Sequence, residues 1–259
     1  MRIMGILNVT PDSFSDGGRY QNEHALRIQV EKLLEEGADC IDVGGESTRP
    51  FSQPVSVAEE LRRIIPAVQM VRSLSTLPIS IDTTKAEVAR QALDAGADII
   101  NDISALRQDP AMAGVAAESR GPVILMHMQG TPETMQKSPE YEDVIDTINK
   151  FFRERIRYAE QKGIARTHII LDPGLGFGKL PEHNATILRE VERFKVHGCP
   201  ILIGHSRKSF FEHLFDLSLS ERDWPTALVS LLCAQRGVEY IRVHDVAKTR
   251  LALDMLSSL

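Results

Sequence analysis

The sequence is poor in cysteine and has no long hydrophobic run. Its cysteines, Cys40, Cys199 and Cys233, are odd in number and lack the C-x-x-C spacing, so we expect buried thiols in a reducing compartment instead of a redox or metal site. The apolar start of the chain ends at Asn8, too early for the apolar segment of a signal peptide. No run approaches the length of a membrane span. These absences predict a cytoplasmic protein with no membrane partner.

An excess of positive charge is also missing. Lys and Arg number 30 against 36 Asp and Glu, which gives a formal net charge of −6. The chain therefore has no basic stripe for nucleic acid, and any phosphate group must be bound by a local cluster of cations. Hydrophobic residues make up 42% of the 259 residues, which is enough for a core of adequate size. No low-complexity linker or change of composition divides the chain, so we predict a single domain over residues 1–259.

Short apolar runs alternate with longer amphipathic stretches along the whole chain. In the amphipathic stretches apolar residues recur three and four positions apart, as in Val144, Ile148, Phe151 and Phe152. Eight such repeats give about 32 residues each, the size of one βα unit. The pattern predicts an α/β fold, a single (β/α)8 TIM barrel, with an open doubly wound sheet as the alternative. The predicted strands are Arg2–Leu7, Asp39–Val43, Pro78–Ile81, Asp98–Ile100, Pro122–Met126, His168–Leu171, Pro200–Ile203 and Glu239–Val243.

A short glycine-led pattern recurs and supports this alternation. Gly37, Gly96 and Gly237 each precede an apolar strand by two or three residues. Glycine at such a place predicts a left-handed residue that ends a helix. The pattern therefore marks junctions from helix to strand. Similar parts are expected for Gly121, Gly163 and Gly198.

Each apolar run ends in a polar side chain. In a barrel of this type the carboxyl ends of the strands meet at one rim, where such enzymes carry their chemistry. A single polar residue there is more often a helix cap or a turn residue, and Asp42 and His127 fit that alternative. A full set at equivalent positions instead indicates a functional site. Its members are Asn8, Asp42, Asp82, Asn101, His127, Asp172, the run His205–Lys208, Arg242 and His244.

The polar set contains two chemical kinds of residue. Asp82, Asn101 and Asp172 offer hydrogen-bond acceptors and an amide, which suit a flat heterocycle with adjacent N–H donors. Cations and a hydroxyl make up the second kind, which suits a polyanion. The sequence thus predicts a site for a planar heterocycle and a polyanion, with a structural ion-pair network as the alternative. The residues of the second kind are Thr48, Arg49, Lys208, Arg242 and His244.

Two glycine-containing stretches resemble known motifs but fail in detail. Gly174–Lys179 is one residue short of the Walker pattern, and Leu180 stands where Ser or Thr is required. We interpret this stretch as a flexible loop. Gly204–Arg207 lacks the second glycine of a nucleophile elbow.

Several longer motifs resemble those of the dihydropteroate synthase family. Residues 4–18, MGILNVTPDSFSDGG, are similar to its first signature, and residues 42–50, DVGGESTRP, are similar to its second. These two motifs are long enough to be highly specific, and the resemblance covers nearly the whole chain. Shorter matches are Ser80–Thr83, Ile100–Asp102, Leu125–Gly130, Asp172–Gly174, Ser206–Ser209 and Ile241–Asp245.

The resemblance implies a pterin-binding TIM barrel of folate biosynthesis. Members of the family join 6-hydroxymethyl-7,8-dihydropterin diphosphate to 4-aminobenzoate and release 7,8-dihydropteroate and pyrophosphate. They are usually homodimers, and the aminobenzoate site is where sulfonamides compete. We therefore expect small-molecule substrates, a second copy of the chain as partner, and Mg²⁺ as cofactor.

The resemblance also implies a role for each residue of the site. One residue, Asn8, matches the ligand of the magnesium ion. The residues that match the pterin pocket are Asp82, Asn101, Asp172 and Lys208. The residues that match the diphosphate contacts are Thr48, Arg49, Arg242 and His244. Those that match the aminobenzoate site are Arg49, Pro50, Phe177 and Ser209.

The resemblance suggests a dissociative reaction, in which pyrophosphate leaves before the arylamine attacks. Stabilisation of charge would then carry most of the catalysis. The alternatives are a pterin-binding methyltransferase domain, which shares the barrel and the Asp/Asn pocket, and a non-catalytic pterin-binding protein. A methyltransferase domain would not need Ser206–Ser209 or the anion site at Thr48 and Arg49. A non-catalytic protein is disfavoured because Asn8, Thr48 and Arg49 are all present. The residues expected to be catalytic are Asp82, Lys208, Arg242 and His244.

Overall fold

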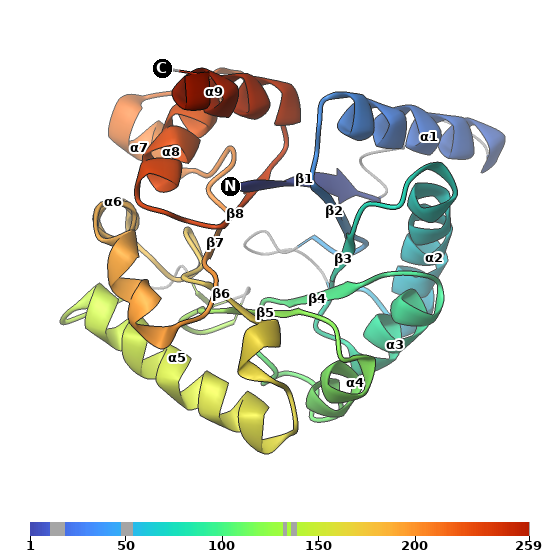
Figure 1. Cartoon of the computed structure of the whole chain (residues 1–259), viewed down its shortest axis with the longest axis horizontal. Coiled ribbons are helices and arrows are strands. Elements are labelled where there is room, and N and C mark those ends of the chain that lie inside the picture. The colour runs from blue at the N-terminus through green and yellow to red at the C-terminus, as the bar shows by residue number, and fades with distance from the viewer. Residues whose placement is uncertain (11–18, 48–53, 132–133, 136–138, 259) are drawn as a thin grey trace.

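The computed structural model describes residues 1–10, 19–47, 54–131, 134–135 and 139–258, and Figure 1 shows a ring of helices around a ring of strands. The strands are β1 (Arg2–Asn8), β2 (Cys40–Gly44), β3 (Ile79–Asp82), β4 (Ile99–Asp102), β5 (Val123–Met126), β6 (Ile169–Asp172), β7 (Leu202–Ile203) and β8 (Tyr240–Val243). The α-helices are α1 (Arg19–Glu35), α2 (Val57–Leu74), α3 (Ala86–Asp94), α4 (Met112–Ser119), α5 (Val144–Gln161), α6 (Pro181–Arg189), α7 (Phe210–Phe215), α8 (Asp223–Gln235) and α9 (Val246–Ser258). Short 3-10 helices are η2 (Arg166–His168), η3 (Val191–His197) and η4 (Leu219–Glu221).

The strands of the described residues form one parallel sheet that closes on itself. Their order is β6-β5-β4-β3-β2-β1-β8-β7. A parallel bridge between Leu171 and Ile201 joins the two edges, and Leu171 N donates to Pro200 O at 2.9 Å. The predicted (β/α)8 TIM barrel is therefore confirmed, and the open doubly wound sheet is excluded. An observed strand overlaps each predicted strand.

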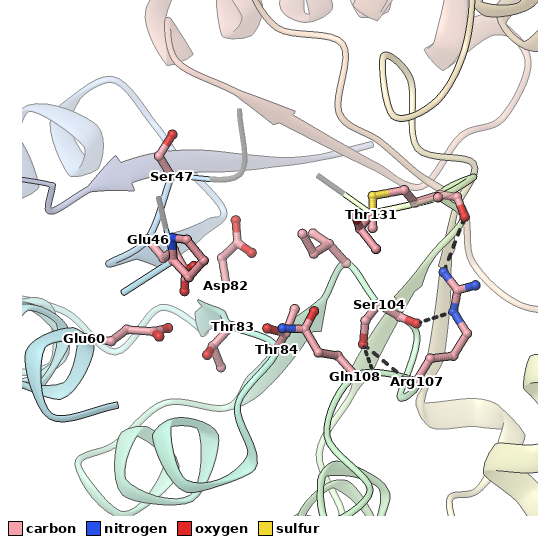
Figure 2. A pocket seen from close by; sticks show the side chains of 14 residues that line it. Glu46, Ser47, Glu60, Asp82, Thr83, Thr84, Ser104, Arg107, Gln108 and Thr131 are labelled. Carbon is pink, nitrogen blue, oxygen red and sulfur yellow. Dashed lines mark hydrogen bonds between the residues drawn. The ribbon is translucent and has the colours of Figure 1, made fainter. Parts of the chain in front are cut away.

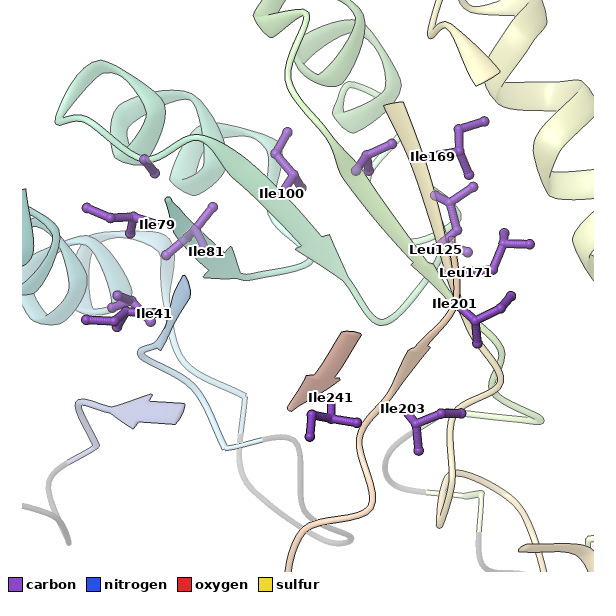
Figure 3. Close-up of a cluster of buried hydrophobic side chains, with 14 of the residues drawn as sticks. Ile41, Ile79, Ile81, Ile100, Leu125, Ile169, Leu171, Ile201, Ile203 and Ile241 are labelled. Atoms are coloured by element: carbon purple, nitrogen blue, oxygen red, sulfur yellow. The ribbon is translucent and has the colours of Figure 1, made fainter. Parts of the chain in front are cut away.

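The strands present different residues to the helices and to the barrel interior. Successive side chains of a strand point to opposite faces. Figure 3 shows the outer set, which includes Ile41, Ile81 and Leu171 and packs with the helices in the main core. A smaller cluster lies on the inner face. Its members are Met4, Cys40, Ile99, Ile124, Ile170 and Leu202.

The inner cluster predicts which polar residues share the interior. Asp42, Asn101 and Asp172 stand two positions after Cys40, Ile99 and Ile170, so their side chains are on the same face, one layer closer to the carboxyl end. All three are buried. The alternation of the strands thus carries the polar strand ends into the barrel.

The glycines between helix and strand behave as the repeat predicts. Gly37, Gly96 and Gly237 follow α1, α3 and α8 with φ of 85°, 113° and 68°. The same expectation is wrong for Gly121: Arg120 takes the left-handed place with φ of 53°. A Cβ at Gly121 would clash with the backbone oxygen of Asp98, so glycine is needed there for close approach.

The prediction of buried thiols is confirmed. Cys40, Cys199 and Cys233 are buried, free thiols. Burial raises the pKa of Cys233 to about 12, which keeps that thiol protonated and unreactive. Within the described ranges, the helices are too short or too polar to cross a bilayer.

Candidate functional site

An ion-pair network occupies the carboxyl end of the barrel between β2, β3, β4 and β8. Arg242 Nε donates to Asp42 Oδ2 at 2.5 Å, and Arg242 Nη2 donates to Asp82 Oδ2 at 3.0 Å. Asn101 Nδ2 donates to Asp42 Oδ1 at 3.3 Å. Both carboxylates are buried, whereas 21% of the Arg242 side chain is exposed. Residues far apart in the sequence therefore meet in one network that is open to a ligand at Arg242.

Asp82 keeps one oxygen for a ligand. Asp82 Oδ1 is buried and has no hydrogen-bond partner among the described residues. Burial raises the pKa of Asp82 to about 7; the Arg242 guanidinium opposes this shift, and the charges of Asp42 and Glu60 add to it. A buried acceptor without a donor costs roughly 1–3 kcal/mol. A ligand N–H that reaches this oxygen would remove that cost.

Asp172 and Lys208 approach the interior from β6 and from the segment after β7. Gly174 N donates to Asp172 Oδ1 at 2.7 Å, and burial raises the pKa of Asp172, which the Lys208 charge opposes. The Lys208 ammonium lies 4.1 Å from the centre of the Phe177 ring. Burial lowers the pKa of Lys208 to about 8, although the Asp172 and Asp82 charges oppose this. Within the described ranges, no carboxylate forms an ion pair with Lys208.

The residues around Lys208 are fixed by a left-handed turn. Arg207 has φ of 55° and donates to both carboxylate oxygens of Asp223, at 2.6 and 2.9 Å. Ser206 Oγ accepts from His244 N at 3.1 Å and lies 2.9 Å from His244 Nδ1. Ser209 is exposed just before α7. The motif at residues 206–209 thus joins His244 to Lys208 through the segment after β7.

A pocket of about 400 Å³ opens beside Asp82, and Figure 2 shows side chains that line it. Asp82 is the predicted site residue that lines it; the pocket extends from there past Thr83 to Arg107. Lys85 lies next to it, in ion pairs with Glu46 and with the fully buried Glu60. The lining residues are Glu46, Ser47, Pro54, Glu60, Asp82, Thr83, Thr84, Ile103, Ser104, Arg107, Gln108, Met128, Gly130 and Thr131.

Asp42 and His127 both follow an apolar run, but their side chains lie in different surroundings. Asp42, for which a cap or turn role is the alternative, is instead bound to Arg242 and Asn101 within the network. His127 packs its ring edge-on against Phe151 of α5, with 4.9 Å between centroids, and so lies outside the barrel interior. Their positions in the strands explain this difference, because successive side chains point to opposite faces. Asp42 stands two positions after an inner residue and so faces the interior, whereas His127 stands one position after the inward-facing Met126 and so faces outward.

Sequence reasoning missed a second set of charged residues. Glu60 and Lys85 lie on α2 and just before α3, and Lys179 lies on the loop after β6. Each belongs to a helix or loop, so the pattern of strand ends could not identify it. A charged residue at an apolar position of a helix, as Glu60 is in α2, is the only signal that the sequence offers for this set. The predicted residues Thr48, Arg49 and Pro50 lie outside the described residues.

Asn8 could contribute one oxygen to a magnesium ion. From the position of a Cβ at Gly44, Asn8 Oδ1 is 3.6 Å away and Asp82 Oδ2 is 3.8 Å away, so two oxygens face this glycine. The described ranges hold no cluster of three His, Cys, Asp or Glu suited to a metal. Mg²⁺ commonly takes one or two protein oxygens and completes its shell with phosphate and water. The donors here fit that mode of binding.

Comparison with known proteins assigns the chain to a family. The family described as pterin binding enzyme matches residues 4–244. A dihydropteroate synthase of Synechocystis sp. is 46% identical over 245 residues, which are 94% of this chain and 85% of that protein. The chain belongs to the dihydropteroate synthase family.

Solved structures of this family superpose closely on the chain. The dihydropteroate synthase of Xanthomonas albilineans with 4-aminobenzoic acid has a TM-score of 0.93 and 44% identity, covering 99% of this chain and 92% of that one. The same enzyme in complex with 7,8-dihydropteroate has a TM-score of 0.89 and 43% identity, with the same shares covered. The family's fold is thus shared over the whole barrel.

Proposed function

We propose that the chain joins 6-hydroxymethyl-7,8-dihydropterin diphosphate to 4-aminobenzoate, giving 7,8-dihydropteroate and pyrophosphate in folate biosynthesis. The observation that carries this proposal is the inward-facing set in which the unpartnered Asp82 oxygen lies beside Arg242, with Asp172 and Lys208 near. Kinship with enzymes of this name at 46% identity supports it.

The acceptors of the set hold the pterin ring. Asp82 Oδ1 accepts a ring N–H, and Asp172 and the Asn101 amide present further polar groups on the same face. Lys208, whose ammonium has no carboxylate ion-pair partner within the described ranges, donates to the ring carbonyl or to the diphosphate. A planar heterocycle with alternating donors and acceptors satisfies the buried groups that the protein leaves open.

The cations hold the diphosphate. A guanidinium has five N–H donors, and the hydrogen bonds of Arg242 to Asp42 and Asp82 leave others for phosphate oxygens. His244 lies two residues further along, and Thr48 and Arg49 complete the set in this proposal. Asn8 would hold Mg²⁺, which when bound supplies positive charge to the leaving pyrophosphate.

The reaction follows from this charge distribution. The bond between the pterin methylene carbon and oxygen breaks first, and its electron pair leaves with pyrophosphate. Asp82 and Asp172 stabilise the positive charge that develops on the pterin. The amine nitrogen of 4-aminobenzoate then forms the new C–N bond and loses a proton. Arg49, Pro50, Phe177 and Ser209 form the aminobenzoate site in this proposal.

The surface of the last helices supports a homodimer. Large apolar side chains on α7, α8 and α9 are more than half exposed, and α8 packs against α9. Exposed apolar side chains that gather on one part of a surface mark association sites. The mass of one chain is 28.9 kDa, and sedimentation velocity should give twice this mass. A single-chain mass would contradict this proposal. The residues are Phe215, Trp224, Leu228, Leu251 and Met255.

We also place the protein in the cytoplasm. The free, buried state of Cys40, Cys199 and Cys233 is in keeping with a reducing compartment. Fractionation of cells that produce the protein would test this location.

The activity is tested by incubating the purified protein with the pterin diphosphate, Mg²⁺ and labelled 4-aminobenzoate. Pyrophosphate release together with labelled dihydropteroate supports the proposal. Binding of the pterin without pyrophosphate release would indicate a non-catalytic protein. Transfer of a methyl group from a methylated pterin, again without pyrophosphate, would indicate a methyltransferase domain.

A further inference from the structure

The loop of residues 173–180, between β6 and α6, is hydrogen-bonded along its length. Gly176 N donates to Asn184 Oδ1 at 2.8 Å, and the Tyr141 hydroxyl donates to Gly178 O at 2.8 Å. A Cβ at Gly178 would lie 2.6 Å from Gln129 O, so the loop packs tightly against the segment after β5. The amides of Gly174, Gly176 and Phe177 donate within the protein, which agrees with rejection of a phosphate loop.

Lys179 is the centre of this arrangement. Its side chain is 3% exposed, and Nζ donates to Gly174 O at 2.9 Å and to Phe177 O at 3.0 Å. On the β5 side, Nζ lies 2.9 Å from His127 Nδ1 and 3.3 Å from His127 O. The ammonium thus ties two points of the loop to the residue that follows β5.

The bonds of Lys179 are unusual for a buried cation. Within the described ranges it forms no ion pair with a carboxylate, and burial lowers its pKa to about 7. Burying a charge without an opposite charge is costly, so the hydrogen bonds of Nζ must compensate for the lost contact with water. Since carbonyl oxygens and the His127 ring surround Nζ, Lys179 is not available to a phosphate as Lys208 is.

We propose that Lys179 is a positioning residue for the aminobenzoate site. It fixes the backbone on both sides of Phe177, and the Phe177 ring in turn lies 4.1 Å from the Lys208 ammonium. The ring position therefore depends on the bonds of Lys179 to Gly174 and Phe177. This inference rests on the proposed synthase activity, because Phe177 belongs to the aminobenzoate site in that proposal.

The first experiment replaces Lys179 by methionine, which keeps the length of the side chain and removes its donors. We expect the KM for 4-aminobenzoate to rise by roughly tenfold, because the hydrogen bonds of Nζ to the loop are lost. The KM for the pterin diphosphate and kcat should change by less than about threefold. Lys162→Met, the same change on an exposed lysine after α5, is the matched control and should match the wild type.

A double-mutant cycle distinguishes positioning from general support of the fold. In a Phe177→Ala background the ring is gone, so Lys179→Met should raise the aminobenzoate KM no further. Equal factors in the two backgrounds, or an equal loss of pterin affinity, would overturn the proposal. An inactive wild type would instead refute the synthase function.

Hydrogen exchange tests the same contact without any activity. Backbone amides of residues 174–180 should exchange about tenfold faster in Lys179→Met than in Lys162→Met. If Lys179→Met fails to fold, Tyr141→Phe removes only the hydroxyl bond to Gly178 O and should produce smaller changes of the same kind. If Lys179→Met folds and the amides of residues 174–180 exchange at the control rate, Lys179 does not stabilise the loop and the proposal is wrong.

Discussion

Arg242, on the β8 side of the carboxyl end, is hydrogen-bonded to two buried carboxylates, whereas Lys208, on the β7 side, forms no ion pair within the described ranges. The carboxylates of Asp42 and Asp82 raise the pKa of Arg242 against the effect of burial. Burial lowers the pKa of Lys208 to about 8. The same rim therefore carries one cation that is bonded to two carboxylates and one that, within the described ranges, has no carboxylate partner.

The difference shows how one site can bind two chemical groups. A guanidinium is planar, and hydrogen bonds to two acids still leave donors that point to a fixed place, which suits a diphosphate. An ammonium on a flexible stem is a point charge that can follow either a ring carbonyl or a phosphate. In the proposed function, Arg242 therefore gives the diphosphate a fixed position, and Lys208 adjusts to the ring carbonyl or to a phosphate.

Of the substitutions at the two cations and their partners, replacement of Arg242 by alanine should have the largest effect on ligand affinity. It removes the fixed cation and leaves Asp42 and Asp82 buried beside each other without their partner. We expect the affinity for the pterin diphosphate to fall on the order of 100- to 1000-fold, and that for the free hydroxymethylpterin by much less. Calorimetric titration with each ligand measures both.

Arg250→Ala is a matched control for this variant. Arg250 also donates to an aspartate and to a backbone carbonyl, Asp39 Oδ2 and Gly37 O at 2.6 Å each, but at the amino end of the strands. It should leave both affinities unchanged. Equal losses of the two ligands in Arg242→Ala would argue against binding of the diphosphate by Arg242.

Asp82→Asn should have the next largest effect. The amide presents a donor where a ring N–H requires an acceptor, so we expect binding of the free hydroxymethylpterin to weaken roughly 10- to 100-fold. Calorimetry of the ligand without its diphosphate isolates this contribution. Asp146→Asn, which removes an exposed carboxylate on α5, should bind normally. Unchanged pterin affinity in Asp82→Asn would mean that Asp82 serves Arg242 alone.

The strand half of the molecule could be predicted from the sequence because its signal is periodic. The apolar runs predicted the strands. The polar residue at the end of each run predicted that Asp82, Asn101 and Asp172 lie on one rim. The same reasoning placed His127 beside them, yet a change of one position in the strand turns it toward α5. Application of the two-residue period to each run would have separated His127 from Asp42.

The loop half could not be predicted, because loop contacts have no period. Gly174–Lys179 gave the expectation of flexibility, whereas the structure shows Lys179 bonded to two carbonyls of its own loop and to His127. Nothing in the order of these residues reveals that the lysine turns back on the loop. The ion pair of Glu60 could not be predicted for a similar reason, since the rest of α2 and the whole of β3 separate Glu60 from its partner Lys85 in the sequence.

The smallest expected effect is the pH dependence of kcat/KM for the pterin diphosphate, which reports the ionisation of Asp82 and Lys208. The ionised Asp82 carboxylate is a stronger acceptor for an N–H than the protonated acid, so activity should rise with pH up to about 7, the raised pKa of this carboxyl. Lys208 is charged only below its lowered pKa of about 8, so activity should fall above that value. We expect a narrow bell, with a change of about tenfold per pH unit on each limb.

The source of each limb is tested by a variant. The ionisation of the substrate's own phosphates also changes with pH, but it is the same for every protein variant. Asp82→Asn should therefore lose the acid limb and keep the alkaline one, whereas Asp146→Asn should keep both. An acid limb that survives in Asp82→Asn would assign it to the substrate or to Asp172. A flat alkaline side would show that the Lys208 charge is not needed for this ligand.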